Sequence, residues 1–323
     1  MSDRNLRWGI LGAARIAREF VCPGIHASSG GSVAAVASRD LGRAEALTEP
    51  YGARAIQGYE ALLGDPEIDA IYIPLANSDH IPWTKRCIEA GKPVLCEKPI
   101  ALEASEIDDL IALRDASGVF VAEAFMVTHH PQWHRARALL RDGAIGQLRA
   151  VQGAFSFFNE DPANIRNQAE LGGGALRDIG VYPCVSTRFV TGAEPVSVVA
   201  QIDWDMGVDG TARVLAAFEG FDLEFYVSMR MGPRQVMTFH GTEGWMSLHA
   251  PFNAGTYGDP VIEIRDADGM RHIERFPGTD HYALQAEAFR ATLLDGAPFD
   301  CPLEFSRGNQ AMIDMIYAAA GPA

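Results

Sequence analysis

The chain has 323 residues, 48% of them hydrophobic and 21% charged, which describes a globular protein too long for a single core. Its formal net charge of −15 argues against a nucleic-acid partner, which requires a basic surface, and against binding to anionic membranes. The cysteines are scattered, no apolar signal region precedes the first predicted strand, and no run approaches the roughly 18 apolar residues of a membrane span. We therefore expect a cytoplasmic protein of two domains with reduced thiols.

The first predicted strand, Leu6–Leu11, ends in a glycine turn that begins a helix. Strand, tight turn and helix start are the context in which a dinucleotide-binding fingerprint has meaning. The turn reads Gly12-Ala13-Ala14-Arg15-Ile16-Ala17, where Gly12 supplies the turn and the small Ala17 lets the helix lie on the strand. Ala14 stands where glycine is usual, but the backbone amides can still face a pyrophosphate. A turn that serves only packing is the alternative.

The second predicted strand, Ser32–Ala37, ends in Ser38-Arg39-Asp40. In dinucleotide-binding folds this end lies by the adenine ribose, where an acidic side chain accepts from the 2′-hydroxyl and an arginine accommodates a 2′-phosphate. Ser38 and Arg39 occupy that position, and Arg43 follows one turn later. These residues predict NADP as the cofactor. Asp40 as the ribose acceptor, which would mean NAD, is the alternative.

Strands and helices then alternate. Predicted strands at Arg54–Ile56, Ala70–Pro74, Val94–Cys96 and Val119–Ala122 are separated by helices at Tyr59–Leu63, Ile81–Ala90 and Glu103–Ala116. Alternation predicts a doubly wound parallel sheet, which binds ligands at the carboxyl ends of its strands. The residues at those ends, which we expect to contact the cofactor, are Pro74, Leu75, Asn77, His80, Glu97 and Lys98. Lys98 is a candidate catalytic cation there, with a helix-capping or surface lysine as the alternative, and its bond to Pro99 favours a cis peptide.

After Ala122 the pattern changes to period-2 strands joined by glycine-rich turns, which predicts a largely antiparallel sheet. The predicted strands are Arg149–Phe157, Val196–Trp204, Ala212–Glu219, Leu223–Met229, Val236–His240, Trp245–Leu248 and Val261–Arg265. A helix at Ala175–Val190 interrupts them, and amphipathic stretches at His281–Leu294 and Leu303–Ala319 close the chain. The adjacent His129 and His130 lack the spacing of metal ligands, so no metal site is expected.

The expected architecture is α/β plus α+β. Residues 1–123 would form an NADP-binding Rossmann domain with a doubly wound parallel sheet. Residues 124–323 would form a substrate-binding and oligomerisation domain on a large, mostly antiparallel open sheet. Strands such as Leu223–Met229 carry apolar or aromatic residues on both faces. Because helices that cover one face would leave the other open, we expect a homodimer or homotetramer through the open face of this sheet.

Three consecutive glycines, Gly172-Gly173-Gly174, precede the helix at Ala175–Val190. Glycine lets the backbone turn sharply and lets another group approach it closely. Asp178 and Tyr182 are four residues apart and share one face of a helix. A carboxylate beside a phenol suits proton transfer, with tyrosine as acid or base once its pKa falls from about 10. The alternative is a surface helix on which neither residue has a chemical role.

Together these motifs resemble those of the glucose–fructose oxidoreductase, inositol dehydrogenase and rhizopine-catabolism family (Gfo/Idh/MocA) over nearly the whole chain. They are the Gly12 turn, Ala37-Ser38-Arg39, Pro74…Asn77…His80, Cys96-Glu97-Lys98-Pro99, Glu123-Ala124-Phe125-Met126, His130-Pro131-Gln132, Asn164-Ile165-Arg166 and Gly172–Pro183. In the family, the lysine of Glu-Lys-Pro lies between nicotinamide and substrate, and the Asp-x-x-x-His/Tyr helix supplies the acid or base. Tyr182 resembles the branch of NADP-linked D-xylose dehydrogenases, glucose–fructose oxidoreductase and dimeric dihydrodiol dehydrogenases. Many relatives carry arginine where Thr128 stands, which leaves one substrate contact open.

The resemblance implies an NADP-dependent oxidoreductase acting on a small sugar or diol. The anomeric hydroxyl of an aldose such as xylose or glucose would lose its proton to Tyr182 while C1 gives hydride to the nicotinamide, forming the lactone. Lys98 would lower the phenol pKa by favouring phenolate, and Asp178 would orient Lys98 or a substrate hydroxyl. Arg166 and His130 are further candidates for cofactor or substrate contact, or for structural pairing. A trans-dihydrodiol dehydrogenase, a ketosugar reductase and a non-catalytic NADP-binding sensor are the alternatives.

Overall fold

The computed structural model describes residues 5–321, and its chain divides into two compact units. The first unit consists of Met1–Met126 with His281–Arg307, and the second of Val127–Asp280 with Gly308–Ala323. The sequence suggested a single crossing after residue 123, whereas here residues 281–307 return to the first unit. Aromatic packing accounts for this return, because the ring of Phe289 lies 4.9 Å from that of Trp8 and 4.8 Å from that of Phe120.

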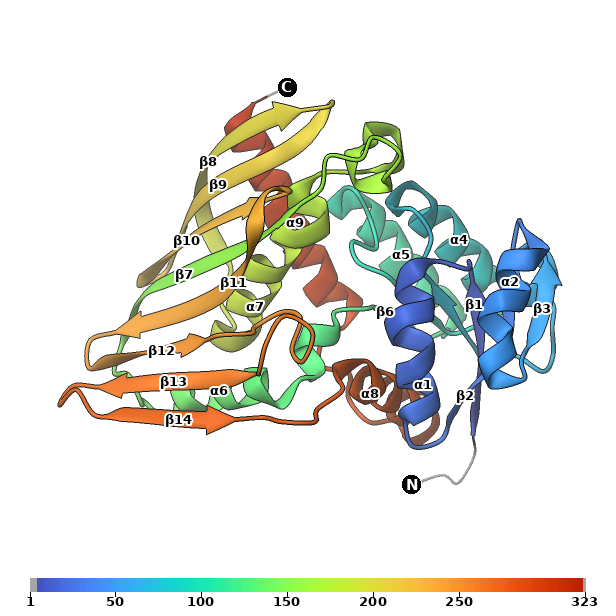
Figure 1. Cartoon of the computed structure of the whole chain (residues 1–323), viewed down its shortest axis with the longest axis horizontal. Coiled ribbons are helices and arrows are strands. Elements are labelled where there is room, and N and C mark those ends of the chain that lie inside the picture. Colours follow the sequence, from blue (N-terminus) through green and yellow to red (C-terminus); the bar gives the residue numbers. More distant parts are fainter. Residues whose placement is uncertain (1–4, 322–323) are drawn as a thin grey trace. The chain divides into compact units, whose positions relative to one another are not determined.

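The first unit is built on a parallel sheet (Figure 1). Among its described residues the sheet has six strands in the order β3-β2-β1-β4-β5-β6, every neighbouring pair parallel. The strands are β1 (Leu6–Leu11), β2 (Gly31–Ser38), β3 (Arg54–Gln57), β4 (Ala70–Ile73), β5 (Val94–Cys96) and β6 (Val121–Glu123). The order reverses at β1, so the unit is the predicted doubly wound sheet, whose ligand-binding crevice lies at such a reversal.

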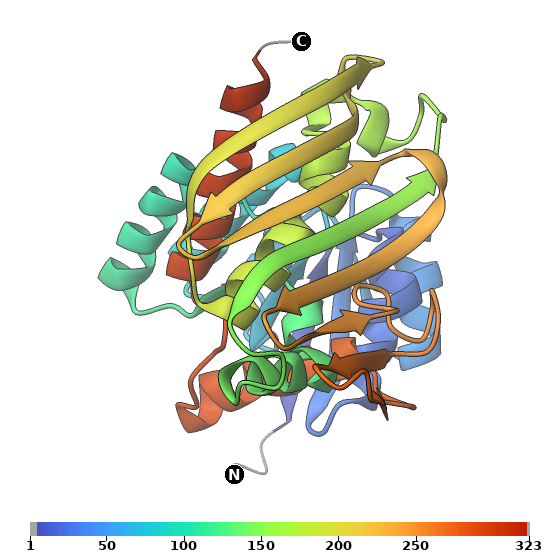
Figure 2. The same ribbon diagram turned by 90° about the vertical axis from the view of Figure 1, so that its left-hand side faces the viewer.

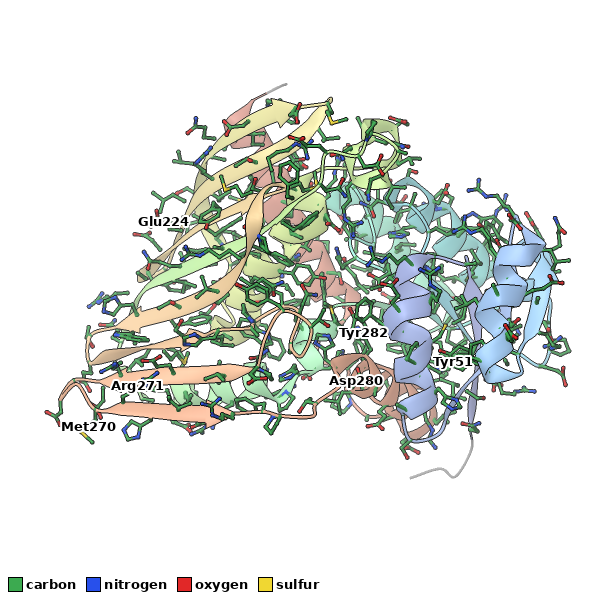
Figure 3. All side chains as sticks on the ribbon, in the orientation of Figure 1. Tyr51, Glu224, Met270, Arg271, Asp280 and Tyr282 are labelled. Carbon is green, nitrogen blue, oxygen red and sulfur yellow. The ribbon has the colours of Figure 1, made fainter. Side chains whose placement is uncertain are left out.

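Helices connect these strands. They are a π-helical turn (Ala17–Val21) continuing as α1 (Cys22–Ala27), α2 (Leu41–Thr48), a 3-10 turn (Glu49–Tyr51), α3 (Glu60–Leu63), α4 (Asn77–Glu89), α5 (Ala104–Ser117) and α8 (His281–Asp295). Every residue of β4 and β5 is buried, as expected of central strands covered on both faces. In α1, Gly24 lies so close to Tyr282 of α8 that a Cβ at this position would come within 2.7 Å of that side chain. The labels Tyr51 and Tyr282 mark this unit in Figure 3.

The second unit is built on a larger sheet, which the described residues form from eight strands in the order β14-β13-β12-β11-β7-β10-β9-β8. The strands are β7 (Leu148–Phe158), β8 (Pro195–Asp205), β9 (Val208–Phe218), β10 (Phe221–Ser228), β11 (Arg230–Gly241), β12 (Gly244–Leu248), β13 (Val261–Asp266) and β14 (Arg271–Arg275). Only β7 and β10 pair in parallel, with Leu223 opposite Val151, so the predicted mostly antiparallel sheet is confirmed. The sequence did not predict β14, because charged or imidazole side chains at four of its five positions hide any apolar alternation.

Helices lie behind this sheet in the view of Figure 2, whose near side shows strands. They are α6 (Pro131–Arg141), a π-helical turn (Leu176–Gly180) continuing as α7 (Val181–Thr191), and the later part of α9 (Leu303–Ala320). Short 3-10 turns occur at Met126–His129, Ile165–Asn167 and Ala169–Leu171. In β10, Leu223, Phe225 and Val227 are buried, while Glu224 between them projects from the outer side of the sheet (Figure 3).

Between residues 5 and 321, no helix is both long and apolar enough to cross a membrane. The same residues contain no group of three or more His, Cys, Asp or Glu side chains placed to hold a metal ion. The cysteines are all buried and free of disulfide bonds, and burial raises the pKa of the Cys22, Cys87 and Cys184 thiols to about 12. These thiols are therefore protonated at neutral pH and poor nucleophiles.

Candidate active site

The glycine turn after β1 has a backbone conformation that favours glycine. Gly12 has a φ of +127°, and a Cβ there would lie 2.8 Å from Cδ2 of Leu75, so only glycine fits. Its amide donates to the carbonyl of Ala37 at 2.9 Å, which ties the turn to the end of β2. Ala13 and Ala14 are only half-buried, and amides in the first turn of a helix have no acceptor within it. These amides therefore fit an anionic group such as a pyrophosphate.

The end of β2 carries the side chains that the sequence predicts to lie by the adenine ribose. The carboxylate of Asp40 caps α2 by accepting from the amide of Arg43 at 3.3 Å, so Asp40 already has a structural role. The guanidinium of Arg43 donates to the carbonyl of Ala13 at 2.8 Å and joins this end to the glycine turn. Arg39 is exposed, and within residues 5–321 its side chain has no hydrogen bond or ion pair. A free guanidinium at this position suits a 2′-phosphate.

His80, on α4, joins two loops at the carboxyl edge of the parallel sheet. Its side chain is 1% exposed, with Nδ1 2.7 Å from the carbonyl oxygen of Pro99 and Nε2 3.1 Å from that of Leu75. Burial lowers the pKa of His80, so the ring is neutral near pH 7 and donates to one of these carbonyls at a time. Both nitrogens thus face backbone atoms, and direct contact of His80 with the cofactor stays a prediction, as it does for Pro74 and Asn77.

The segment that carries Lys98 is held on both sides. Before it, Glu97 accepts a hydrogen bond of 2.6 Å from the hydroxyl of Tyr72, a buried residue of β4. After it, the Lys98–Pro99 peptide is cis, and the amide of Ile100 donates to Oε1 of Glu123 at 2.9 Å. Glu123 is 3% exposed, and burial raises its pKa to about 8 although the Ile100 amide and the Ser306 hydroxyl oppose that shift. The sequence indicated Glu123 only as part of a motif and gave no sign that its carboxyl group accepts a hydrogen bond from the Ile100 amide.

In the second unit, Tyr182 lies in the first turn of α7 and is 6% exposed. Its ring centroid is 5.5 Å from that of Phe155 on β7 and 5.4 Å from that of Phe252, and these two rings stack on each other at 5.0 Å. An enclosure of aromatic rings limits the access of water to the phenol.

The loop that carries Phe252 is fixed at its base. Gln132 donates to the carbonyls of Ala250 and Pro251 at 3.1 and 3.2 Å, and Trp133 donates to that of Pro251 at 2.9 Å. On the other side of Phe252, Asn253 and Gln235 exchange hydrogen bonds of 2.9 and 2.7 Å. The carbonyls that Gln132 and Trp133 contact are far along the chain, so no local signal in the sequence pointed to them. They hold one wall of the Tyr182 enclosure in place.

Asp178 lies in the π-helical turn before α7, and its side chain forms an ion pair. Its Oδ2 lies 2.6 Å from Nε of Arg166, whose guanidinium stands 5.9 Å from the centre of the Phe157 ring. Turns of this kind are frequent at functional sites and depart from the regular α-helix that the sequence suggested. Arg166 thus pairs with a predicted catalytic residue, and its contact with the cofactor stays a prediction.

His130 caps α6 with a completely buried side chain. Its Nδ1 accepts from the amide of Gln132 at 3.2 Å, and its ring lies 6.2 Å from that of Phe276. This is the structural pairing that the sequence left open for His130. Thr128, which stands where many relatives carry arginine, is also buried.

Comparison with known proteins gives the family of the chain. Residues 6–125 match the model of an oxidoreductase family with an NAD-binding Rossmann fold, and residues 133–247 match the Gfo/Idh/MocA C-terminal domain. An uncharacterized oxidoreductase of Rhizobium meliloti is 41% identical over 98% of this chain and 97% of its own. The NADP-dependent D-xylose 1-dehydrogenase 2 of Haloferax volcanii is 34% identical over 98% of this chain and 97% of its own.

A solved structure of similar shape is that of a 3-ketoreductase from Actinomadura kijaniata, in complex with NADP and TDP-benzene. It is 31% identical, covers 97% of each chain and superimposes with a TM-score of 0.90. The resemblance inferred from the motifs and the predicted fold class are both confirmed. The chain is a member of the Gfo/Idh/MocA family of oxidoreductases.

Proposed function

We propose that this protein transfers a hydride between NADP and a sugar, oxidising an aldose at C1 to the lactone. Tyr182 serves as the acid or base, Lys98 favours its phenolate form, and Asp178 orients Lys98 or a hydroxyl of the substrate. The observation that carries the proposal is the enclosure of Tyr182, a 6% exposed residue whose ring contacts Phe155 on β7 and Phe252 on a loop held by hydrogen bonds. A merely structural surface tyrosine would not need such an enclosure.

The first unit supplies the residues that would hold the cofactor. The amides of Gly12, Ala13, Ala14, Arg15 and Ile16 would bind the pyrophosphate, and Ser38, Arg39 and Arg43 would surround the 2′-phosphate. Support comes from the positive φ of Gly12, the unpaired guanidinium of Arg39 and the capping role of Asp40. NADP, when bound, supplies the hydride chemistry at its nicotinamide ring.

The protein's own side chains manage the proton. In the oxidative direction the phenolate oxygen of Tyr182 takes the proton of the anomeric hydroxyl while the hydride leaves C1. In the reductive direction the phenol returns that proton to the carbonyl oxygen of the substrate. A cation near the phenol favours its charged form, and exclusion of water strengthens the effect. A positioned acid or base of this kind typically contributes about 10²–10⁴-fold to the rate.

The experiment uses an aldose deuterated at C1 and oxidised NADP. We expect reduced nicotinamide that carries the deuterium, together with one lactone per cofactor reduced, as measured by mass spectrometry. A panel of xylose, glucose and other aldoses identifies the preferred substrate. Absence of deuterium transfer from every aldose, while NADP binds, would contradict aldose oxidation by this protein.

A ketosugar reductase is the second candidate, and one observation favours it. The Actinomadura kijaniata enzyme that superimposes at a TM-score of 0.90 is a 3-ketoreductase. The same phenol would then act in the reverse sense, giving its proton to a ketone. Supplying deuterated reduced cofactor with ketosugars and with nucleotide-linked ketosugars in parallel assays tests this candidate, because deuterium would appear on the carbon of the reduced ketone.

The outer face of the eight-stranded sheet supports the proposed homo-oligomer. A hollow of about 890 Å³ opens there, lined by residues including Val199, Leu215 and Met231. These apolar side chains are 69%, 49% and 37% exposed. We expect light scattering at micromolar concentration to give the mass of a dimer or tetramer. Leu215→Glu should reduce that mass, whereas Met270→Glu, at the exposed turn between β13 and β14 (Figure 3), should not. A monomer mass for the unmodified protein would contradict this assembly.

A further inference from the structure

A buried carboxylate touches the start of the helix that carries Asp178 and Tyr182. Asp209, near the start of β9, is 1% exposed. Its Oδ2 accepts a hydrogen bond of 2.6 Å from the amide of Leu176, and its Oδ1 accepts one of 2.8 Å from the hydroxyl of Tyr317 on α9. Leu176 begins the π-helical turn that contains Asp178 and continues into α7. All these residues belong to the second unit.

The position of this carboxylate also explains the last of the three glycines. Gly174 has a φ of +123°, which other residues rarely adopt. A Cβ at this position would overlap Oδ1 of Asp209 and stand 2.9 Å from its Cγ. The group whose close approach the glycine run indicated is therefore Asp209. The neighbouring Gly173 has a different partner, since its Cβ would lie 2.5 Å from the carbonyl oxygen of Arg166.

The chemistry of this contact favours a fixed helix start. The first amides of a helix lack acceptors within it, and negative charge is stabilised at that end. Burial raises the pKa of Asp209 to about 6, and the Leu176 amide, the Tyr317 hydroxyl and the nearby Arg177 oppose that rise. The charged form consequently predominates at pH 7, and its hydrogen bonds are of the charge-assisted kind, which are shorter and stronger than neutral ones.

We propose that Asp209 is a positioning residue, which fixes the start of the helix bearing Asp178 and Tyr182 and is itself oriented by Tyr317. The inference rests on the proposed function, because it assigns Asp209 to the placement of the proposed acid or base. It extends that function because Asp209 lies outside the glycine-rich motif, on strand β9, and has its partner Tyr317 on the last helix. Through these contacts Asp209 sets the geometry of proton transfer.

The test compares three variants in the full-length protein. Asp209→Asn retains the volume but removes the charge, and Tyr317→Phe removes one hydrogen bond while leaving the carboxylate. Thr211→Val is the matched control, because Thr211 lies on the same strand, is 5% exposed and bonds to Ser228 at 2.7 Å. Hydrogen exchange of residues 174–182 reports whether the helix start is held. Steady-state kinetics report kcat and the KM for NADP.

We expect Asp209→Asn to speed exchange in residues 174–182 by roughly ten- to hundredfold, the factor that corresponds to losing a charge-assisted hydrogen bond. Its kcat should fall by about tenfold or more, with a KM for NADP near that of the unmodified protein. Tyr317→Phe should change both quantities in the same direction by less, and Thr211→Val should change neither.

Unchanged exchange in both Asp209→Asn and Tyr317→Phe would overturn the inference, and so would faster exchange with unchanged kcat. If Asp209→Asn does not fold, Tyr317→Phe decides by the same criteria. Failure of the proposed function has a different signature. In that case the unmodified protein would not oxidise any aldose, or Tyr182→Phe would keep near-normal turnover. The exchange of residues 174–182 would still report whether Asp209 holds the start of the helix.

Discussion

Replacing Gly174 with alanine tests how tightly the glycine run and Asp209 are fitted together. The new Cβ would occupy the place of Oδ1 of Asp209, on a backbone whose φ is +123°. Forcing a non-glycine residue into such a region costs about 1–3 kcal/mol. Displacing the buried carboxylate from the Leu176 amide adds about 1.5–3 kcal/mol. We therefore expect the free energy of unfolding to fall by roughly 2.5–6 kcal/mol.

Gly192, just after the same helix, provides the matched control. Its φ is +68°, and a Cβ there would meet nothing within 4 Å. Gly192→Ala should cost only the strain of the left-handed region, about 1–2 kcal/mol. Urea unfolding followed by circular dichroism compares the two variants in the same unit. The clash should also be relieved by Asp209→Ala, so that a double-mutant cycle gives a coupling of about 1 kcal/mol or more. Equal costs for Gly174→Ala and Gly192→Ala, with no coupling to Asp209, would refute this reasoning.

Three further predictions concern the first unit. Arg39→Ala should weaken NADP binding roughly ten- to hundredfold and NAD binding little, as measured by fluorescence titration. Arg18→Ala is the control, and equal losses of affinity for NADP and NAD in Arg39→Ala would exclude a contact with the 2′-phosphate. Because burial raises the pKa of Glu123 to about 8, the native state holds a proton that the unfolded state loses. The free energy of unfolding should thus fall as pH rises from about 4.5 to 8. Glu123→Gln lacks this titration, so in urea titrations its free energy of unfolding should rise relative to that of the unmodified protein by up to about 1 kcal/mol per pH unit. Absence of this relative rise would contradict a buried neutral acid at position 123. Lys98→Met should lower kcat for aldose oxidation and move the acidic limb of its pH–rate profile toward the reference pKa of tyrosine near 10, because the base must be a phenolate, and an unmoved limb would exclude the cation as the cause.

Much of the fold was predictable because its strands carry simple patterns. The predicted strand at Leu6–Leu11 and that at Val94–Cys96 have the bounds observed for β1 and β5, since each is a short apolar run that ends at a change of polarity. The return of α8 to the first unit was not predictable in this way. It depends on the packing of Phe289 against aromatic residues that are far away in the sequence, and no local pattern encodes that contact.

The candidate site was predictable where a residue belongs to a motif and obscure where it acts through the backbone. The sequence pointed to Lys98, whose chain neighbours Glu97 and Ile100 are hydrogen-bonded, to Tyr182, whose ring is buried, and to a close approach at the glycine run. It did not identify Asp209 as the approaching group, nor Glu123 as the acceptor for the Ile100 amide. Both are buried acids on strands, and their partners are main-chain amides for which the sequence carries no signal.

The central claim is that Tyr182 transfers the proton, and Tyr182→Phe tests it most directly. This change removes one hydroxyl and leaves the ring among its phenylalanine neighbours, so folding and NADP binding should survive. The measurement is kcat together with the melting temperature, and Tyr226→Phe on β10 serves as a control for the loss of a hydroxyl. We expect kcat to fall by about 10²–10⁴-fold with little change in melting temperature. Near-normal turnover in Tyr182→Phe would contradict the assignment.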